Sequence, residues 1–136
     1  MEKVRLNNDE LEVCLMYVLK PILEKYDVLL HEIDLSMTHK VKGYAKIGYQ
    51  GHDFDAYFSF GLKYQDNKIC FEDIQGKVEY LFLKFDLLQL CMQCIQLSDI
   101  TFDENCLLYT CDFPLSSITI HDGELEVILD KKRYIE

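Results

Sequence analysis

Residues 79–97, EYLFLKFDLLQLCMQCIQL, form a helix-length stretch that is apolar around nearly the whole circumference of a helical wheel. Its polar residues share one narrow stripe: Glu79, Asp86, Gln89, Gln93 and Gln96. A helix with so little polar surface must be covered on several sides by protein, by a partner or by an apolar ligand. We therefore predict a helix over 79–97 and ask what covers it.

The segments on either side of this stretch show two further periodicities. Apolar residues at helical spacing predict an earlier helix over about Asp9–Lys25, in which Pro21 predicts a kink or an end. Asn7, Asn8 and Asp9 supply its N-terminal cap. Alternation of apolar and polar residues predicts eight strands, at about 27–38, 42–49, 53–63, 68–75, 98–102, 106–113, 116–121 and 124–129.

The predicted order is α-ββββ-α-ββββ in a single domain, 1–136. Runs of strands separated by helices indicate an α+β fold, with the helices laid on one face of an antiparallel sheet. Asp122-Gly123 predicts a tight hairpin between the last two strands, because both residues suit the positive φ angles of a type I′ turn.

Composition narrows the classes of function. The chain has 49% hydrophobic and 28% charged residues, as ordinary globular domains do, and a formal charge of −10. That charge argues against nucleic acid and against electrostatic attachment to anionic lipid. No apolar run approaches the length of an integral membrane span, and MEKVRLNNDELEV lacks the apolar core of a signal peptide. We expect a cytoplasmic protein, with secretion by another route left open.

Six cysteines do not make a disulfide scaffold without an oxidising compartment, so we predict reduced thiols that pack as small hydrophobes. Cys91 and Cys94 match C-x-x-C, but both fall inside the predicted helix, without the tight turns of a zinc knuckle. We predict no metal site and no cofactor, and a metal or redox role of this pair remains the lesser alternative.

Catalytic motifs are scarce. The four histidines form no metal-binding pair, no serine lies in G-x-S-x-G, and no glycine-rich phosphate loop occurs. His31 shares the apolar face of its predicted strand and is expected to be a core histidine. We therefore predict that the protein is not an enzyme.

Lys84 is the exceptional residue of the 79–97 segment, because on the wheel it lies among apolar neighbours, nearly opposite Asp86. The simpler interpretation is a lysine whose stem lies along apolar surface while its amine reaches water. The functional interpretation is a cation at the mouth of an apolar groove, suited to a lipid or fatty-acid headgroup.

The chain resembles the soluble domain of YpmS-like proteins of Gram-positive bacteria. The resemblance lies in element order and in the segments 74–78 (IQGKV), the following apolar helix, 100–103 (ITFD) with 107–109 (LLY), and 117–127 (SITIHDGELEV). The opening residues 6–11 (LNNDEL) also match the start of their first helix. Those proteins carry an N-terminal membrane anchor, for which this sequence shows no counterpart.

YpmS-like proteins are similar to the TULIP group of tubular lipid-binding domains. This resemblance implies a strongly curved antiparallel sheet wrapped on two helices, with an apolar groove that can hold lipid tails. Other TULIP-like proteins, including accessory proteins in clostridial toxin clusters, work mainly through protein–protein assembly.

Two hypotheses of function follow. In the first, the protein binds a lipid, a fatty acid or another apolar small molecule without catalysis, in a groove between the sheet and the second helix. The predicted ligand-binding residues are Phe54, Phe58, Phe60, Lys84, Phe85, Leu88, Met92 and Ile95. In the second, the surplus apolar surface is covered by a protein partner or by another copy in a homo-oligomer. Many of these residues are also what a domain of this size needs for its core.

Overall fold

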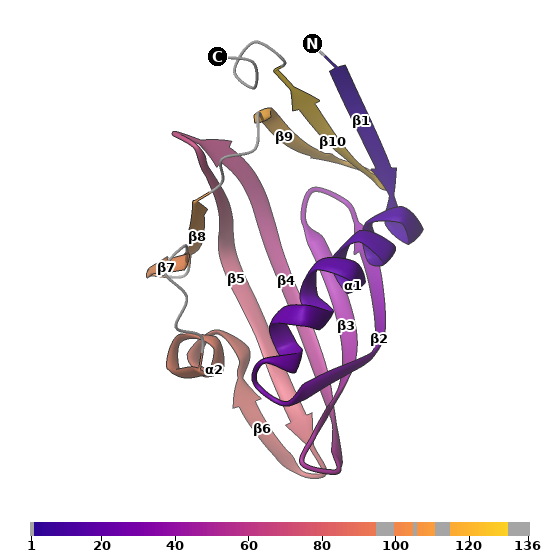
Figure 1. The fold of residues 1–136 in the computed structure, drawn as a ribbon, viewed down its shortest axis with the longest axis vertical. Coiled ribbons are helices and arrows are strands. Elements are labelled where there is room, and N and C mark those ends of the chain that lie inside the picture. The colour runs from indigo at the N-terminus through magenta and orange to yellow at the C-terminus, as the bar shows by residue number, and fades with distance from the viewer. Residues whose placement is uncertain (1, 95–99, 105, 111–114, 131–136) are drawn as a thin grey trace.

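The computed structural model describes residues 2–94, 100–104, 106–110 and 115–130, and these residues form two helices and ten strands (Figure 1). In chain order the elements are β1 (Glu2–Asn7), α1 (Asn8–Glu24), β2 (Val28–Met37), β3 (Val41–Tyr49), β4 (His52–Gln65), β5 (Lys68–Tyr80), β6 (Leu83–Asp86), α2 (Leu87–Cys94), β7 (Ile100–Asp103), β8 (Cys106–Thr110), β9 (Leu115–His121) and β10 (Glu124–Leu129).

The strands pair antiparallel in two sheets, which confirms the predicted α+β class. The larger sheet has seven strands in the order β2-β3-β4-β5-β8-β7, with β6 also paired to β5. β5 is shared along its length: residues 68–71 pair with β8 and residues 77–80 pair with β6. The smaller sheet has the order β1-β10-β9, and β9 lies against β4 of the larger sheet.

Helix α1 begins and ends close to its predicted bounds. Asn7 accepts a hydrogen bond from the backbone N–H of Glu10, whose side chain in turn accepts one from the N–H of Asn7, a reciprocal cap. The helix continues through Pro21 and ends three residues later. From the same helix, Glu12 accepts a hydrogen bond from the backbone N–H of Leu35 in β2 at 2.6 Å. A side chain thus occupies part of the open edge of β2.

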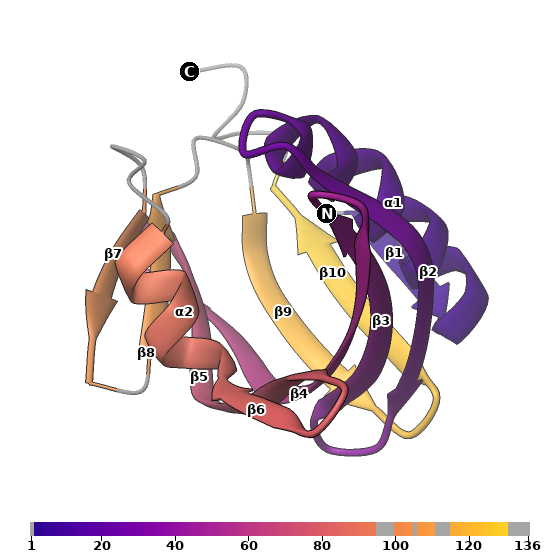
Figure 2. The ribbon, with the colours of Figure 1, turned by 90° about the horizontal axis from the view of Figure 1, so that it is seen from below.

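The core lies between α1, the smaller sheet and one face of the larger sheet, which we call the inner face (Figures 1 and 2). Its buried residues come from α1, β2, β3, β4, β5 and β10: Leu11, Leu30, Ile33, Leu35, Met37, Val41, Ala45, Ala56, Val78 and Leu125. Helix α2 lies beside β5 and β6, away from α1 (Figure 2). Neither described helix is long and apolar enough to cross a bilayer.

The predicted helix over 79–97 is wrong in its first half. Residues 79–80 end β5, residues 83–86 form β6, and α2 begins only at Leu87. Asp86 accepts a hydrogen bond from the backbone N–H of Gln89 and so caps the helix at this point. The order therefore contains two strands that the sequence did not predict, β1 and β6. Pairing with β5 and with β10 stabilises strands that are too short to show a clear period of their own.

His31 is not a core histidine. The pairing of β2 with β3 shifts between Leu30 and Glu32, a β-bulge that moves His31 off the apolar face. Its side chain is half exposed, with Nε2 3.6 Å from Oδ1 of Asp53. The same bulge buries Leu30 and leaves Leu29, which alternation placed inside, exposed.

Candidate functional site

Two rows of side chains cross the inner face from β3 to β6 and reach solvent at β6. In the first row Ala45 lies opposite Ala56, Ala56 opposite Val78, and Val78 opposite Phe85. Ala45, Ala56 and Val78 are all buried, whereas Phe85 is 41% exposed. The cover over this row therefore stops at β5.

The second row ends in the same way. It contains Ile47, Phe54, Tyr80 and Leu83, where Phe54 contacts Tyr80 with ring centroids 4.8 Å apart. Leu83, the β6 member of this row, is 45% exposed. We call Leu83 and Phe85 the β6 strip. Alternation of Leu83 and Phe85 with Lys84 and Asp86 was the sequence signal for this strip, and it was obscured by the high apolar content of the segment.

The predicted aromatic residues of β4 all lie on the inner face and are half-buried. Phe58 stacks on Phe60 with centroids 6.1 Å apart, and Phe60 meets the edge of Phe71 from β5 at 5.4 Å. With the contact of Phe54 and Tyr80, these rings line much of β4 and β5. They pack against the core, so they contribute to stability whether or not a ligand binds.

Two glycines make room for the packing around Phe58. A Cβ on Gly43 would lie 2.3 Å from the Phe58 ring, so the ring occupies the space that a side chain at 43 would need. A Cβ on Gly76 would lie 2.4 Å from the backbone oxygen of Tyr57 and 2.9 Å from the side chain of Leu87. Gly76 therefore allows α2 to approach β5 closely.

The predicted site residues of helix α2 differ in their exposure to solvent. Leu88 is buried, Met92 is exposed, and Ile95 lies outside the described residues. Leu87 and Leu90 pack against the core. The two residues of α2 predicted as ligand contacts thus have different surroundings, and only Met92 is open to a further contact.

Lys84 and Phe85 cannot line one groove, because adjacent residues of a strand point to opposite faces. Phe85 shares the inner face with Val78, and Lys84 lies opposite Glu79 on the outer face. Lys77, which is opposite Asp86, places its Nζ 2.9 Å from Oε1 of Glu79. The helical wheel that made Lys84 a cation at the mouth of an apolar groove is therefore wrong, and Lys84 belongs to a ladder of alternating charges.

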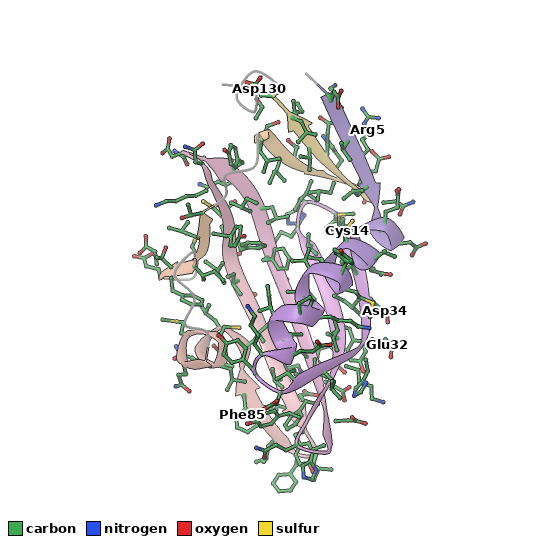
Figure 3. All side chains as sticks on the ribbon, in the orientation of Figure 1. Arg5, Cys14, Glu32, Asp34, Phe85 and Asp130 are labelled. Carbon is green, nitrogen blue, oxygen red and sulfur yellow. The ribbon has the colours of Figure 1, made fainter. Side chains whose placement is uncertain are left out.

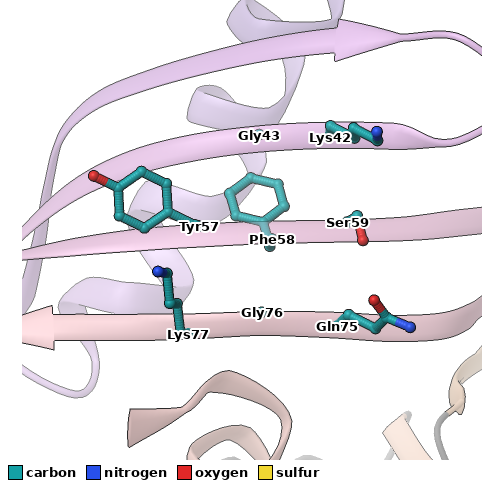
Figure 4. Close-up of a pocket in the computed structure, with 8 residues that line it drawn as sticks. All are labelled: Lys42, Gly43, Tyr57, Phe58, Ser59, Gln75, Gly76 and Lys77. Atoms are coloured by element: carbon teal, nitrogen blue, oxygen red, sulfur yellow. The ribbon is translucent and has the colours of Figure 1, made fainter. Parts of the chain in front are cut away.

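The outer face carries a shallow depression of about 520 Å³ over β3, β4 and β5 (Figure 4). The row Gly43, Phe58 and Gly76 crosses its floor, flanked by the outward side chains of Lys42, Ser59, Gln75, Tyr57 and Lys77. The ammonium group of Lys77 lies 5.5 Å from the centroid of the Tyr57 ring. Open to solvent and lined by mixed polar groups, the depression lacks the enclosure of a ligand pocket.

Among the described residues, two side chains have clearly shifted pKa values: the half-buried Tyr44 and the exposed Asp73. The Tyr44 hydroxyl donates to Oδ1 of Asp55 at 2.6 Å, and this hydrogen bond, with burial and the charge of Asp55, raises the pKa of Tyr44 to about 12. A hydrogen bond from Lys40, and then the charge of Lys40, lower the pKa of Asp73. The first pair ties the neighbouring strands β3 and β4 together, and the second ties the β2–β3 turn to β5.

The described residues contain no group of three or more His, Cys, Asp or Glu side chains placed to hold a metal ion. Among the described cysteines, Cys14, Cys70 and Cys106 are free thiols. The side chain of Cys94 and all of Cys111 lie outside the description, so a joint role of Cys91 and Cys94 stays a hypothesis.

Comparison of the chain with protein-family models, with curated proteins and with solved structures returned no match. The resemblance to TULIP domains therefore stays a prediction, and the functional argument depends on the geometry above.

Proposed function

We propose that this chain is a non-catalytic binding protein that holds a lipid or fatty acid against its inner face at the β6 strip. The observation that carries the proposal is the end of the row Ala45, Ala56, Val78 and Phe85, which is buried in three strands and open in the fourth. A tubular, TULIP-like curvature of the larger sheet around the two helices is part of the same proposal.

The chemistry of the strip suits an alkyl chain. Leu83 and Phe85 are exposed, and Phe54 and Tyr80 continue the same apolar surface toward the core. Each methylene that leaves water in such a contact contributes about 0.8 kcal/mol. Met92 on the neighbouring helix is exposed as well, and its flexible thioether adapts to irregular apolar partners.

The proposal differs from the sequence prediction in the role of Lys84. Since Lys84 points to the outer face, it does not reach a headgroup at the strip. Affinity should therefore come from the alkyl chain, with little selection between a fatty acid and a neutral lipid of the same length.

A protein partner is the second candidate, and the same exposed residues favour it. Leu83, Phe85 and Met92 are exposed on adjacent elements, so a partner helix or strand could cover them in place of a ligand. A second copy of this chain is included in that class.

Native mass spectrometry of the purified protein, followed by organic extraction, tests the first candidate directly. We expect a lipid or fatty acid at near one per chain, and displacement by a fluorescent long-chain fatty acid. The double variant Leu83→Ser/Phe85→Ser should lose most of that binding. Lys84→Ala, on the opposite face of the same strand, is the matched control and should retain it.

Each other result counts against lipid binding. Equal loss in Lys84→Ala and in the double variant would contradict the strip, and a protein that neither carries nor takes up lipid would contradict the proposal. A ligand-free homodimer that dissociates in the double variant would support the second candidate instead.

A further inference from the structure

The tip of the β5–β6 hairpin has an unusual composition. Its two turn residues, Leu81 and Phe82, are 81% and 87% exposed. Figure 1 shows this hairpin at one end of the larger sheet, beside the β3–β4 turn and far from β1 and β10 of the smaller sheet. The described part of the chain therefore leaves both side chains largely uncovered, whereas it buries the core residues almost completely.

Backbone geometry does not require apolar residues at this tip. Leu81 has φ +55°, a left-handed conformation that branched and bulky residues adopt at a cost. The other tight turns with both central residues described have polar or glycine residues there: Gln50-Gly51, Asp66-Asn67 and Asp122-Gly123. The φ of Leu81 is unfavourable for a leucine, and both exposed side chains are unfavourable in water, which indicates a contact outside the chain.

The area of the tip argues against a flat protein interface. A stable dimer buries about 800 Å² on each partner, far more than two side chains on a protruding turn provide. A convex apolar tip is instead suited to a soft medium that closes around it. The interface of a lipid bilayer is such a medium.

The groups behind the tip fit the depth of that interface. Tyr80 ends β5, and its hydroxyl lies 2.7 Å from Nδ1 of His52, at the start of β4. Tyr49, opposite His52 in the sheet, is also exposed. Tyrosines with one apolar and one polar end are enriched where a membrane meets water.

The charges of the hairpin and of the whole chain indicate which kind of lipid bilayer suits the tip. Along the hairpin the cations Lys77 and Lys84 lie opposite Asp86 and Glu79, so the four charges cancel. The whole chain carries a formal charge of −10, which opposes approach to anionic lipid.

We propose that Leu81 and Phe82 insert into the interface of a zwitterionic lipid bilayer and dock the protein there through apolar contact. This docking is independent of whether the β6 strip holds a ligand, because the tip residues and the strip residues are different.

Flotation with phosphatidylcholine vesicles tests the docking. We expect the wild-type chain to float with the vesicles and the double variant Leu81→Asn/Phe82→Gly to lose binding at least about tenfold. Asparagine tolerates the positive φ of residue 81 and glycine is permissive at residue 82, so the variant should fold at least as well as the parent. Gln50→Asn, in the neighbouring turn, is the matched control and should float normally.

A spectroscopic measurement reports the contact itself. The chain has no tryptophan, so Phe82→Trp places a single reporter at the tip. Its emission should shift to shorter wavelength when phosphatidylcholine vesicles are added, whereas a reporter at the exposed Tyr17 of α1 (Tyr17→Trp) should not shift.

Three results would overturn the proposal. The first is a wild-type chain that does not float, and the second is equal flotation of the double variant. The third is a concentration-dependent dimer in sedimentation that the double variant abolishes, because the tip would then be covered by a second copy.

Discussion

Phe85 of β6 lies directly opposite Val78 of β5, yet Val78 is almost fully buried and Phe85 is 41% exposed (Figure 3 labels Phe85). In an antiparallel pair such neighbours have their Cβ atoms about 5 Å apart and normally share one environment. Here the environment changes between two adjacent strands. The inner face therefore contains both the edge of the core and the start of an uncovered apolar surface.

This difference predicts that truncating the two side chains lowers the free energy of unfolding by unequal amounts. Val78→Ala removes two buried methyl groups and should lower the free energy of unfolding by about 2 kcal/mol. Phe85→Ala removes a much larger side chain but should cost less than about 1 kcal/mol, because much of the ring already contacts water. Urea denaturation of both variants measures the two values. A larger loss for Phe85→Ala would mean that the ring belongs to the core.

The sequence was sufficient where a signal is local. Asn7 caps α1 within the predicted stretch 7–9, and Asp122-Gly123 joins β9 to β10 as predicted. Only Gly123, at φ +79°, has a positive φ in that turn, so the predicted type I′ conformation is wrong. It was insufficient where pairing decides the conformation. Apolar content alone does not distinguish a short strand from a helix, so residues 83–86 were assigned to the wrong element until their pairing with β5 was known.

A prediction of site residues depends on the helix or strand assignment more strongly than a prediction of fold class does. The alternation of residues in β4 was assigned to the correct faces, and Phe54, Phe58 and Phe60 lie on one face as predicted. Lys84 and Phe85 were placed side by side by a helical period, and a period of two separates them onto opposite faces. The bulge at His31 has the same consequence for β2, because one extra residue reverses the facing of those that precede it.

The apolar turn should be replaceable with a gain in stability. Leu81→Asn/Phe82→Gly relieves the left-handed conformation of a leucine and should raise the free energy of unfolding by about 1 kcal/mol. Chemical denaturation in the absence of lipid is the measurement. A loss of stability would show that Leu81 or Phe82 packs within the folded chain.

Gly76 should be intolerant of even one methyl group. A Cβ there would meet the backbone oxygen of Tyr57, which cannot move without distorting β4, so Gly76→Ala should cost about 2–3 kcal/mol. Gly61→Ala is the control within the same sheet, since its Cβ would meet only the flexible side chain of Glu72, at 3.2 Å. Thermal unfolding of both variants distinguishes them, and equal melting temperatures would contradict the close approach of the Tyr57 backbone oxygen to position 76.

Glu12 should protect the edge of β2 as well as stabilise it. Glu12→Ala removes the acceptor of the Leu35 N–H, and a hydrogen bond to a charged group contributes about 1.5–3 kcal/mol. The variant should unfold more easily and aggregate faster on heating, because the edge of the sheet is less covered. Glu24→Ala removes the same charge from an exposed position of α1 and is the control. Light scattering and denaturation that do not separate the two variants would exclude the protective role.

The hydrogen bond between Tyr44 and Asp55 predicts the alkaline behaviour of the chain. The pKa of Tyr44 rises from 10.0 to about 12, so the pair stabilises the folded state fully below pH 10. This contribution is lost as the pH rises through about 12, where Tyr44 ionises in the folded protein. The stability difference between the wild-type chain and Tyr44→Phe should therefore be constant from pH 7 to about 9 and disappear above about 12. Ultraviolet absorption at high pH, compared between these two proteins, gives the titration of this tyrosine. In Asp55→Asn the titration should move down toward 10, and an unchanged midpoint would mean that Asp55 is not the cause of the shift.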